Sequence, residues 1–156
     1  MHADAAHLIV NMYVLYTFGS AVEHNFELLF GPLWAAYFLV LYVGGMFLSA
    51  LPGFIRHRNN YNYHGVGASG AVSAVVFSFI LMQPDTNLTL IFLPFFSLPA
   101  IVFGLLYLGL EIYLDKNKRS PIAHSAHYVG GIFGLVYTAA LEPKLLILLW
   151  EWIQSF

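Results

Sequence analysis

A serine enclosed by glycines is the first feature of this sequence that could do chemistry. Ser69 lies between Gly67 and Gly70, at the start of an apolar run that continues to Met82. Glycines let the backbone turn sharply and let another chain approach closely, and the start of a helix offers unpaired N–H groups for an oxyanion. The pattern suggests a nucleophile, although glycine and serine are also common packing residues in membrane helices.

A histidine further along the chain could serve this serine as a base. His127 is followed by Gly130 and Gly134, which lie on the same face of a helix. Gly70 begins a similar face of small residues on the serine segment, so close packing of the two helices predicts that Ser69 and His127 meet near one end of a bundle. Histidine titrates near neutrality and can take a serine proton and return it to a leaving amine.

A polar pair near the N-terminus could support this chemistry. His7 and Asn11 are four residues apart and therefore share one face of a helix. Such side chains inside a membrane either serve a site or hydrogen-bond between helices, and the residues alone favour neither. Gly19 and Glu23 have the same spacing, and we interpret them as structural residues that close the first helix.

Metal chemistry has weaker support in the sequence. His124 and His127 have the spacing of two metal ligands on a helix, but a closed site needs further ligands and the sequence names none. There is no H-E-x-x-H zinc helix and no pair of membrane aspartates, and the absence of cysteine excludes thiolate chemistry. We therefore expect neither a metal nor a cofactor.

The composition is that of a membrane protein. Of the 156 residues, 60% are hydrophobic and only 9% are charged, and the mean hydropathy is +0.74. A net charge of −2 provides no basic surface for nucleic acid. The N-terminus has no signal-peptide pattern, and without repeats or low-complexity linkers we expect one domain over residues 1–156.

Five apolar segments have about the length needed to span a bilayer. They cover approximately residues 5–22, 32–51, 66–82, 88–114 and 122–141. Pro94 and Pro99 interrupt the fourth, so we expect an irregular stretch there and a helix from about Pro99. The tail, 145–156, is too short to span and should lie at the interface with Trp150 and Trp152. The sequence predicts an all-α, polytopic transmembrane helical bundle.

These motifs together resemble the rhomboid family of intramembrane serine proteases, of the bacterial type. Each motif is short, but the four occur in the family's order and on separate predicted segments, so the resemblance covers nearly the whole chain. The motifs are H-x-x-x-N at His7 and Asn11, G-x-x-x-E at Gly19 and Glu23, G-x-S-G at Gly67, Ser69 and Gly70, and A-H-x-x-G-x-x-x-G at Ala126, His127, Gly130 and Gly134.

The resemblance implies a serine endopeptidase that cuts transmembrane protein substrates within the lipid bilayer. It makes Ser69 the nucleophile and His127 the base of a dyad without a carboxylate, and no acid lies in the histidine helix. It also implies an oxyanion site built from the Ser69 N–H, His7 and Asn11. The expected location is a bacterial inner membrane, with a multi-pass topology.

Three features depart from the family pattern. The rhomboid core has six helices, and the helix expected before Ala5 is missing, so the domain looks N-terminally incomplete. Ser73 stands where some rhomboids carry a tyrosine that stacks on the histidine, which leaves the orientation of His127 to another neighbour. Basic residues of two loops, among them Arg56 and Lys116, predict a cytoplasmic active-site face. The resemblance predicts the opposite orientation, which we follow.

Two other functional classes remain compatible with the sequence. A non-proteolytic rhomboid relative would bind transmembrane segments without cutting them, but such proteins typically lose a catalytic residue, and Ser69 and His127 are both present. A small transporter or channel fragment would use the polar residues to line a pathway and would show flux without cleavage. The sequence specifies neither the oligomeric state nor a particular substrate.

Overall fold

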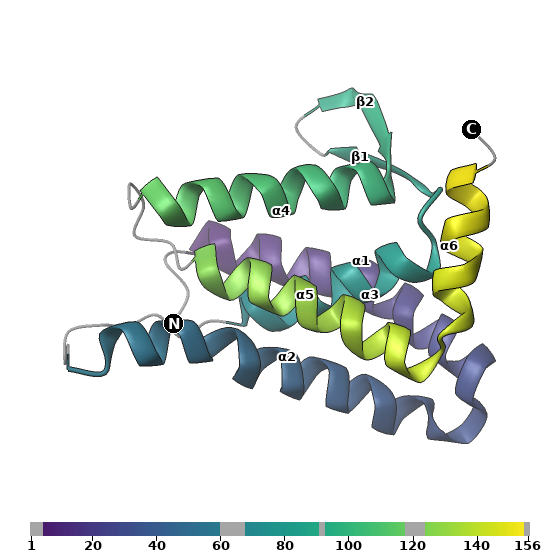
Figure 1. Cartoon of the computed structure of the whole chain (residues 1–156), viewed down its shortest axis with the longest axis horizontal. Coiled ribbons are helices and arrows are strands. Elements are labelled where there is room, and N and C mark those ends of the chain that lie inside the picture. Colours follow the sequence, from purple (N-terminus) through teal and green to yellow (C-terminus); the bar gives the residue numbers. More distant parts are fainter. Residues whose placement is uncertain (1–4, 60–67, 91–92, 118–123, 155–156) are drawn as a thin grey trace.

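The computed structural model describes residues 5–59, 68–90, 93–117 and 124–154 (Figure 1). The predicted all-α, rhomboid-like bundle is confirmed as the fold class. The elements, in chain order, are helix α1 (Ala5–Phe30), the 3-10 turn η1 (Gly31–Leu33), helices α2 (Trp34–His57) and α3 (Ser69–Met82), strands β1 (Asn87–Leu90) and β2 (Leu93–Pro99), and helices α4 (Ala100–Asn117), α5 (His124–Leu141) and α6 (Lys144–Gln154).

Helix α3 is the centre of the bundle. It has only 14 residues, and every position from Gly70 to Leu81 is buried. A helix that is apolar on all sides must be surrounded on all sides. Helices α1, α2, α4 and α5 all pack against it, and Figure 1 shows α3 behind α5, between α2 and α4.

Glycines allow α5 to lie directly against the backbone of α3. A Cβ at Gly130 would clash with the carbonyl of Gly70, and one at Gly134 would clash with the carbonyl of Ala74, one turn further along. Gly70 in turn faces the Ser49 side chain of α2. The small faces of the two helices therefore meet backbone to backbone, which is the contact that small residues permit between membrane helices.

The outward surface of the helices is apolar. Large side chains such as Tyr16, Phe47, Phe54 and Leu105 are exposed, as expected for a bundle whose solvent is lipid. Counted as one helical run through α1, η1 and α2, Ala5–His57 is the one stretch among the described residues that is long and apolar enough to cross a membrane by itself. α5 and α6 meet this test together, although the chain bends by 107° between them. The number of spans remains a prediction.

Helix α1 extends further than the sequence predicted. We expected it to end near Val22, but it continues to Phe30, so Gly19 and Glu23 lie within the helix and do not close it. The helix ends where Gly31 adopts a φ of +54° and Pro32 follows. Because no glycine or proline lies between Glu23 and Phe30, nothing in the backbone chemistry stops the helix earlier.

A β-hairpin occupies most of the stretch that was expected to be irregular. β1 and β2 pair antiparallel, with Asn87 opposite Pro99, and the register shifts between Thr89 and Leu90. The helix predicted from about Pro99 is confirmed, since α4 begins at Ala100. Its first N–H groups are satisfied from outside the helix, because Ala100 donates to the Thr86 carbonyl at 2.9 Å.

The glycine contact leads to a stability prediction. Gly130→Ala is expected to lower the free energy of unfolding by about 2 kcal/mol, because the added methyl group must push α5 away from α3. Gly109→Ala is the matched control, since Gly109 is also helical and no heavy atom would lie within 4 Å of its Cβ. Thermal unfolding in detergent measures both variants. An equal loss in both would contradict the packing role of Gly130.

Candidate active site

Ser69 is the first residue of α3, at the end of the bundle where that helix begins. The first helical hydrogen bond runs from the Val72 N–H to the Ala68 carbonyl, at 2.9 Å. The N–H of Ser69 is therefore among the donors at a helix N-terminus that have no partner within the helix. The Ser69 side chain is partly exposed. Gly67, which we predicted to pack around this serine, lies outside the described residues.

His127 lies in the first turn of α5, at the same end of the bundle. A Cβ on Gly70 would lie 3.0 Å from the carbonyl oxygen of Ala126, so Ser69 and His127 each neighbour a residue at which α3 and α5 approach closely. Among the hydrogen bonds of the described residues, none joins Ser69 to His127. The fold thus brings the two helix starts together without pairing these side chains.

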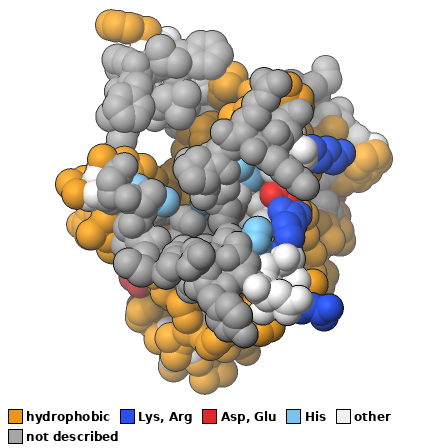
Figure 2. All heavy atoms as spheres, turned by 90° about the vertical axis from the view of Figure 1, so that its left-hand side faces the viewer, with side chains coloured by type: hydrophobic (Ala, Val, Ile, Leu, Met, Phe, Trp, Pro, Cys, Tyr) orange, Lys and Arg blue, Asp and Glu red, His pale blue; other side chains and the backbone are white. Residues whose placement is uncertain are grey.

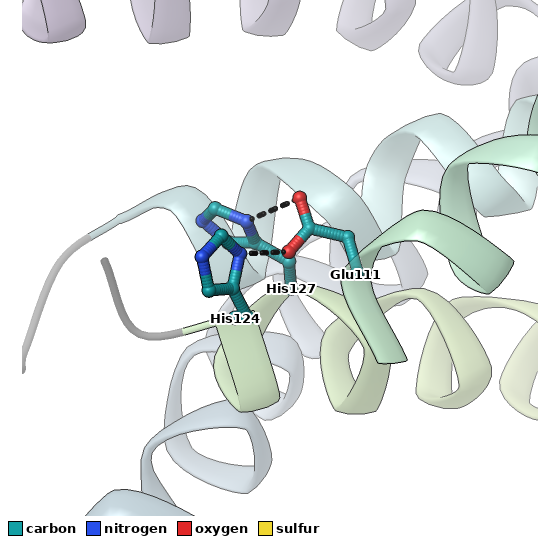
Figure 3. A group of neighbouring side chains, drawn as sticks. All are labelled: Glu111, His124 and His127. Atoms are coloured by element: carbon teal, nitrogen blue, oxygen red, sulfur yellow. Dashed lines mark hydrogen bonds and ion pairs between the residues drawn. The ribbon is translucent and has the colours of Figure 1, made fainter. Parts of the chain in front are cut away.

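A buried carboxylate from α4 holds two histidines of α5 (Figure 3). His127 Nδ1 is 3.0 Å from Glu111 Oε1, and His124 Nδ1 is 2.7 Å from Glu111 Oε2. An ionised carboxylate only accepts hydrogen bonds, so both Nδ1 atoms donate to it. In the neutral ring, a proton on Nδ1 leaves Nε2 with a free lone pair, which is the tautomer that a general base requires.

An aromatic ring from α4 flanks the same histidine. The rings of Tyr107 and His127 are stacked, with centroids 6.4 Å apart and planes inclined by 25°. Some rhomboids have a tyrosine at the position of Ser73, and that tyrosine stacks on the histidine. In this chain Tyr107 of α4 stacks on His127 instead.

Asn11 of the polar pair on α1 makes a hydrogen bond within its own helix. Asn11 is buried, and its Nδ2 donates to the His7 carbonyl at 2.9 Å. An amide nitrogen carries two hydrogens, so one donor of Asn11 is left for another acceptor. His7 is half-buried one turn earlier. No hydrogen bond among the described residues links Asn11 to Ser69 or His127, and the oxyanion role of this pair remains a prediction.

The rim of the site carries an ion pair between two helix ends. Arg56, in the last turn of α2, binds Asp115 of α4 through two hydrogen bonds of 3.0 and 3.2 Å. Figure 2 views this end of the bundle and shows basic, acidic and histidine side chains close to one another, with hydrophobic side chains beside them. Charged and polar side chains thus gather at the end of the bundle where α3 and α5 begin.

Sequence reasoning missed Glu111 and Tyr107, because the search for an acid was confined to the histidine helix. A signal was available. Glu111 is an acid within the apolar segment predicted for residues 88–114, and ionisable residues inside membrane helices usually face a site or a partner. What the sequence could not supply was the partner, since Glu111 and His127 belong to different helices.

Comparison with known proteins identifies the family of this chain. The Rhomboid domain matches residues 1–144. The chain belongs to the rhomboid family. As a rhomboid domain it is an integral membrane protein, which agrees with its composition and its apolar exterior.

The chain is similar to curated rhomboid-like proteins of mitochondria. It is 30% identical to RHOMBOID-like protein 12, mitochondrial, of Arabidopsis thaliana, over 90% of this chain and 44% of that protein. It is 27% identical to the human presenilin-associated rhomboid-like protein, mitochondrial, over 87% of this chain and 34% of that protein. The chain thus spans less than half the length of these relatives. No solved structure matches it.

The shared carboxylate leads to a second stability prediction. Glu111→Ala is expected to cost about 2 kcal/mol of unfolding free energy, because the buried His124 and the half-buried His127 both lose their acceptor. Asp115→Ala, one turn further along α4, is the control. Its partner Arg56 is 48% exposed, and a surface pair contributes less than about 1 kcal/mol. Thermal unfolding of both variants measures the two losses of stability. A larger loss for Asp115→Ala than for Glu111→Ala would contradict the stabilising role of the Glu111 network.

Proposed function

We propose that this rhomboid domain is an intramembrane serine endopeptidase with Ser69 as nucleophile and His127 as general base. The observation that supports it best is the hydrogen bond from His127 Nδ1 to Glu111. It leaves His127 Nε2 able to accept a proton at the end of the bundle where Ser69 begins α3. Glu111 and Tyr107 act as positioning residues for this base.

The reaction follows from these roles. Ser69 Oγ attacks the carbonyl carbon of the scissile peptide while His127 Nε2 takes its proton. The resulting imidazolium is stabilised by the Glu111 carboxylate, and it gives the proton to the leaving amine as the C–N bond breaks. Water then attacks the acyl-enzyme, with His127 again as the base, and releases the new carboxylate and Ser69.

The negative charge on the attacked oxygen needs donors that are already in place. The Ser69 N–H at the start of α3 has no hydrogen-bond partner among the described residues, and Asn11 keeps one amide hydrogen beyond its bond to the His7 carbonyl. We assign these two donors, with the His7 side chain, to the oxyanion. Such donors act strongly where water is scarce, because they need no reorganisation during the reaction.

The substrate we propose is a membrane-anchored helix cut near its end. A helix in lipid satisfies its own backbone hydrogen bonds, so it must unwind locally before a serine can reach a peptide carbonyl. Segments with glycine or proline near the scissile bond meet this condition at the lowest cost. The bacterial inner membrane remains our predicted location, whereas the names of the similar proteins place those proteins in mitochondria.

The first experiment separates proteolysis from mere binding of transmembrane segments. A fluorophosphonate probe is expected to label Ser69 in the wild-type protein. It should not label Ser69→Ala, and it should label His127→Ala much more slowly than the wild type. Cleavage of a reconstituted transmembrane substrate should be lost in the same variants. A folded wild-type protein that binds such a substrate but neither reacts with the probe nor cleaves would support the non-proteolytic alternative.

The second experiment tests the oxyanion assignment. Asn11→Ala is expected to slow cleavage by roughly a hundredfold, the typical cost of one oxyanion donor, with Ser69 still in place. Asn25→Ala is the matched control, because Asn25 makes the same kind of bond within α1, from Nδ2 to the Ala21 carbonyl at 2.8 Å. Turnover is measured per folded molecule beside thermal stability. Near-normal turnover of Asn11→Ala would remove Asn11 from the site.

A further inference from the structure

Three metal-ligating side chains converge beside the proposed base (Figure 3). Glu111 comes from α4, while His124 and His127 come from the first turn of α5, and one ligand atom of each lies within 4.8 Å of the others. We propose that these residues form a zinc-binding site and that zinc bound there inhibits the enzyme. The inhibitory effect rests on the proposed protease function, whereas zinc binding does not.

The donor set has the chemistry that Zn²⁺ prefers. Two imidazole nitrogens and one carboxylate are a known set of three protein ligands for zinc, with a fourth position left to water. The sequence offered only the two histidines, at positions i and i+3, and Glu111 supplies the third ligand. The two Nδ1 atoms now lie 2.7 and 3.0 Å from the carboxylate oxygens as hydrogen-bonded pairs. These contacts must lengthen to about 3.3 Å, the distance between ligands around a tetrahedral zinc ion, so small side-chain shifts admit the metal.

The surroundings of the three ligands suit a cation. Glu111 brings one negative charge, and the next charged residue of α4 on that side, Asp115, is already paired with Arg56. His124 is only 6% exposed, and its Nε2 has no hydrogen-bond partner among the described residues. The proposed ligand of this side chain is the other nitrogen, Nδ1, so Glu111 is the one hydrogen-bond partner among the described residues that zinc would replace at His124.

Zinc binding would stop His127 from acting as a base while the side chain stays in the site. A neutral imidazole has one N–H proton, and binding zinc through Nδ1 requires that proton to move to Nε2. His127 Nε2 then donates a hydrogen bond and cannot accept the proton of Ser69. His127 is active when its Nδ1 donates to Glu111 and inactive when its Nδ1 binds zinc.

Binding is tested without any proteolysis. Ser69→Ala protein, purified in detergent with its affinity tag removed, is titrated with Zn²⁺ by calorimetry and with Co²⁺ by visible absorption. We expect one ion per chain and the intense absorption bands of tetrahedral Co²⁺. Adding His124→Gln or Glu111→Gln should weaken binding by at least the roughly 10- to 100-fold that loss of an outer-shell partner costs. His24→Gln, at an exposed histidine of α1, is the control and should bind as before.

Inhibition is tested in the protein with Ser69 intact. Each variant's cleavage and probe labelling with Zn²⁺ are divided by its own metal-free rates, so a lower basal rate does not bias the comparison. We expect zinc to slow both reactions in the wild type and in His24→Gln, and to have much less effect in His124→Gln.

The possible failures are distinct. Equal zinc affinity in Ser69→Ala with and without His124→Gln, with both proteins folded by thermal unfolding, would overturn the site. Tight zinc binding with unchanged labelling of the wild type would overturn the inhibition. A metal-free wild type that neither cleaves nor reacts with the probe would contradict the proposed function and leave the binding result standing.

Discussion

The contact of α5 with the backbone of α3 is the constraint on which the rest of this structure depends. In a bilayer, helices gain little by hiding apolar surface from lipid, so association relies on close packing. Gly130 and Gly134 provide it, because each lies against a carbonyl of α3 with no room for a side chain. This contact sets the depth and rotation of α5, and with them the position of His127 relative to Ser69.

The buried carboxylate is the second constraint, and it is an electrostatic one. An ionised group inside an apolar bundle is costly unless hydrogen bonds satisfy it. Glu111 meets this condition by accepting from two histidines, one on each oxygen. The arrangement fixes the tautomer of His127 and gathers three metal ligands at the same time. Orientation of a base and affinity for zinc therefore arise from one set of atoms.

The parts of the fold that could be predicted from the sequence are those set by local pattern. Apolar length located the main helices, proline located the start of α4, and glycine spacing identified the faces of α3 and α5. The end of α1 was missed because Gly19 and Glu23 suggested an end, whereas the backbone-breaking residues come only at Gly31 and Pro32. The two strands were missed because their pairing joins residues, such as Asn87 and Pro99, that no local spacing relates.

The candidate site shows the same limit at the level of single side chains. Ser69 and His127 were found from short motifs, but the two groups that orient the histidine both come from α4, and no local spacing relates Glu111 to a residue of α5. Nor could spacing show that an aromatic ring reaches His127 from α4 when position 73 carries serine.

Because the aromatic ring beside His127 comes from α4 and not from α3, the orientation of the histidine depends on the position of α4. A tyrosine at position 73 would belong to α3, the most buried helix, and would keep its place if the outer helices moved. Tyr107 and Glu111 instead belong to α4, whose outward side chains Leu105 and Leu106 are exposed and whose packing is mainly against α5. Any displacement of α4 from α5 would separate the ring and the carboxylate from His127 together. The orientation of His127 thus depends on how α4 packs against α5, whereas Ser69 is held by the buried helix α3.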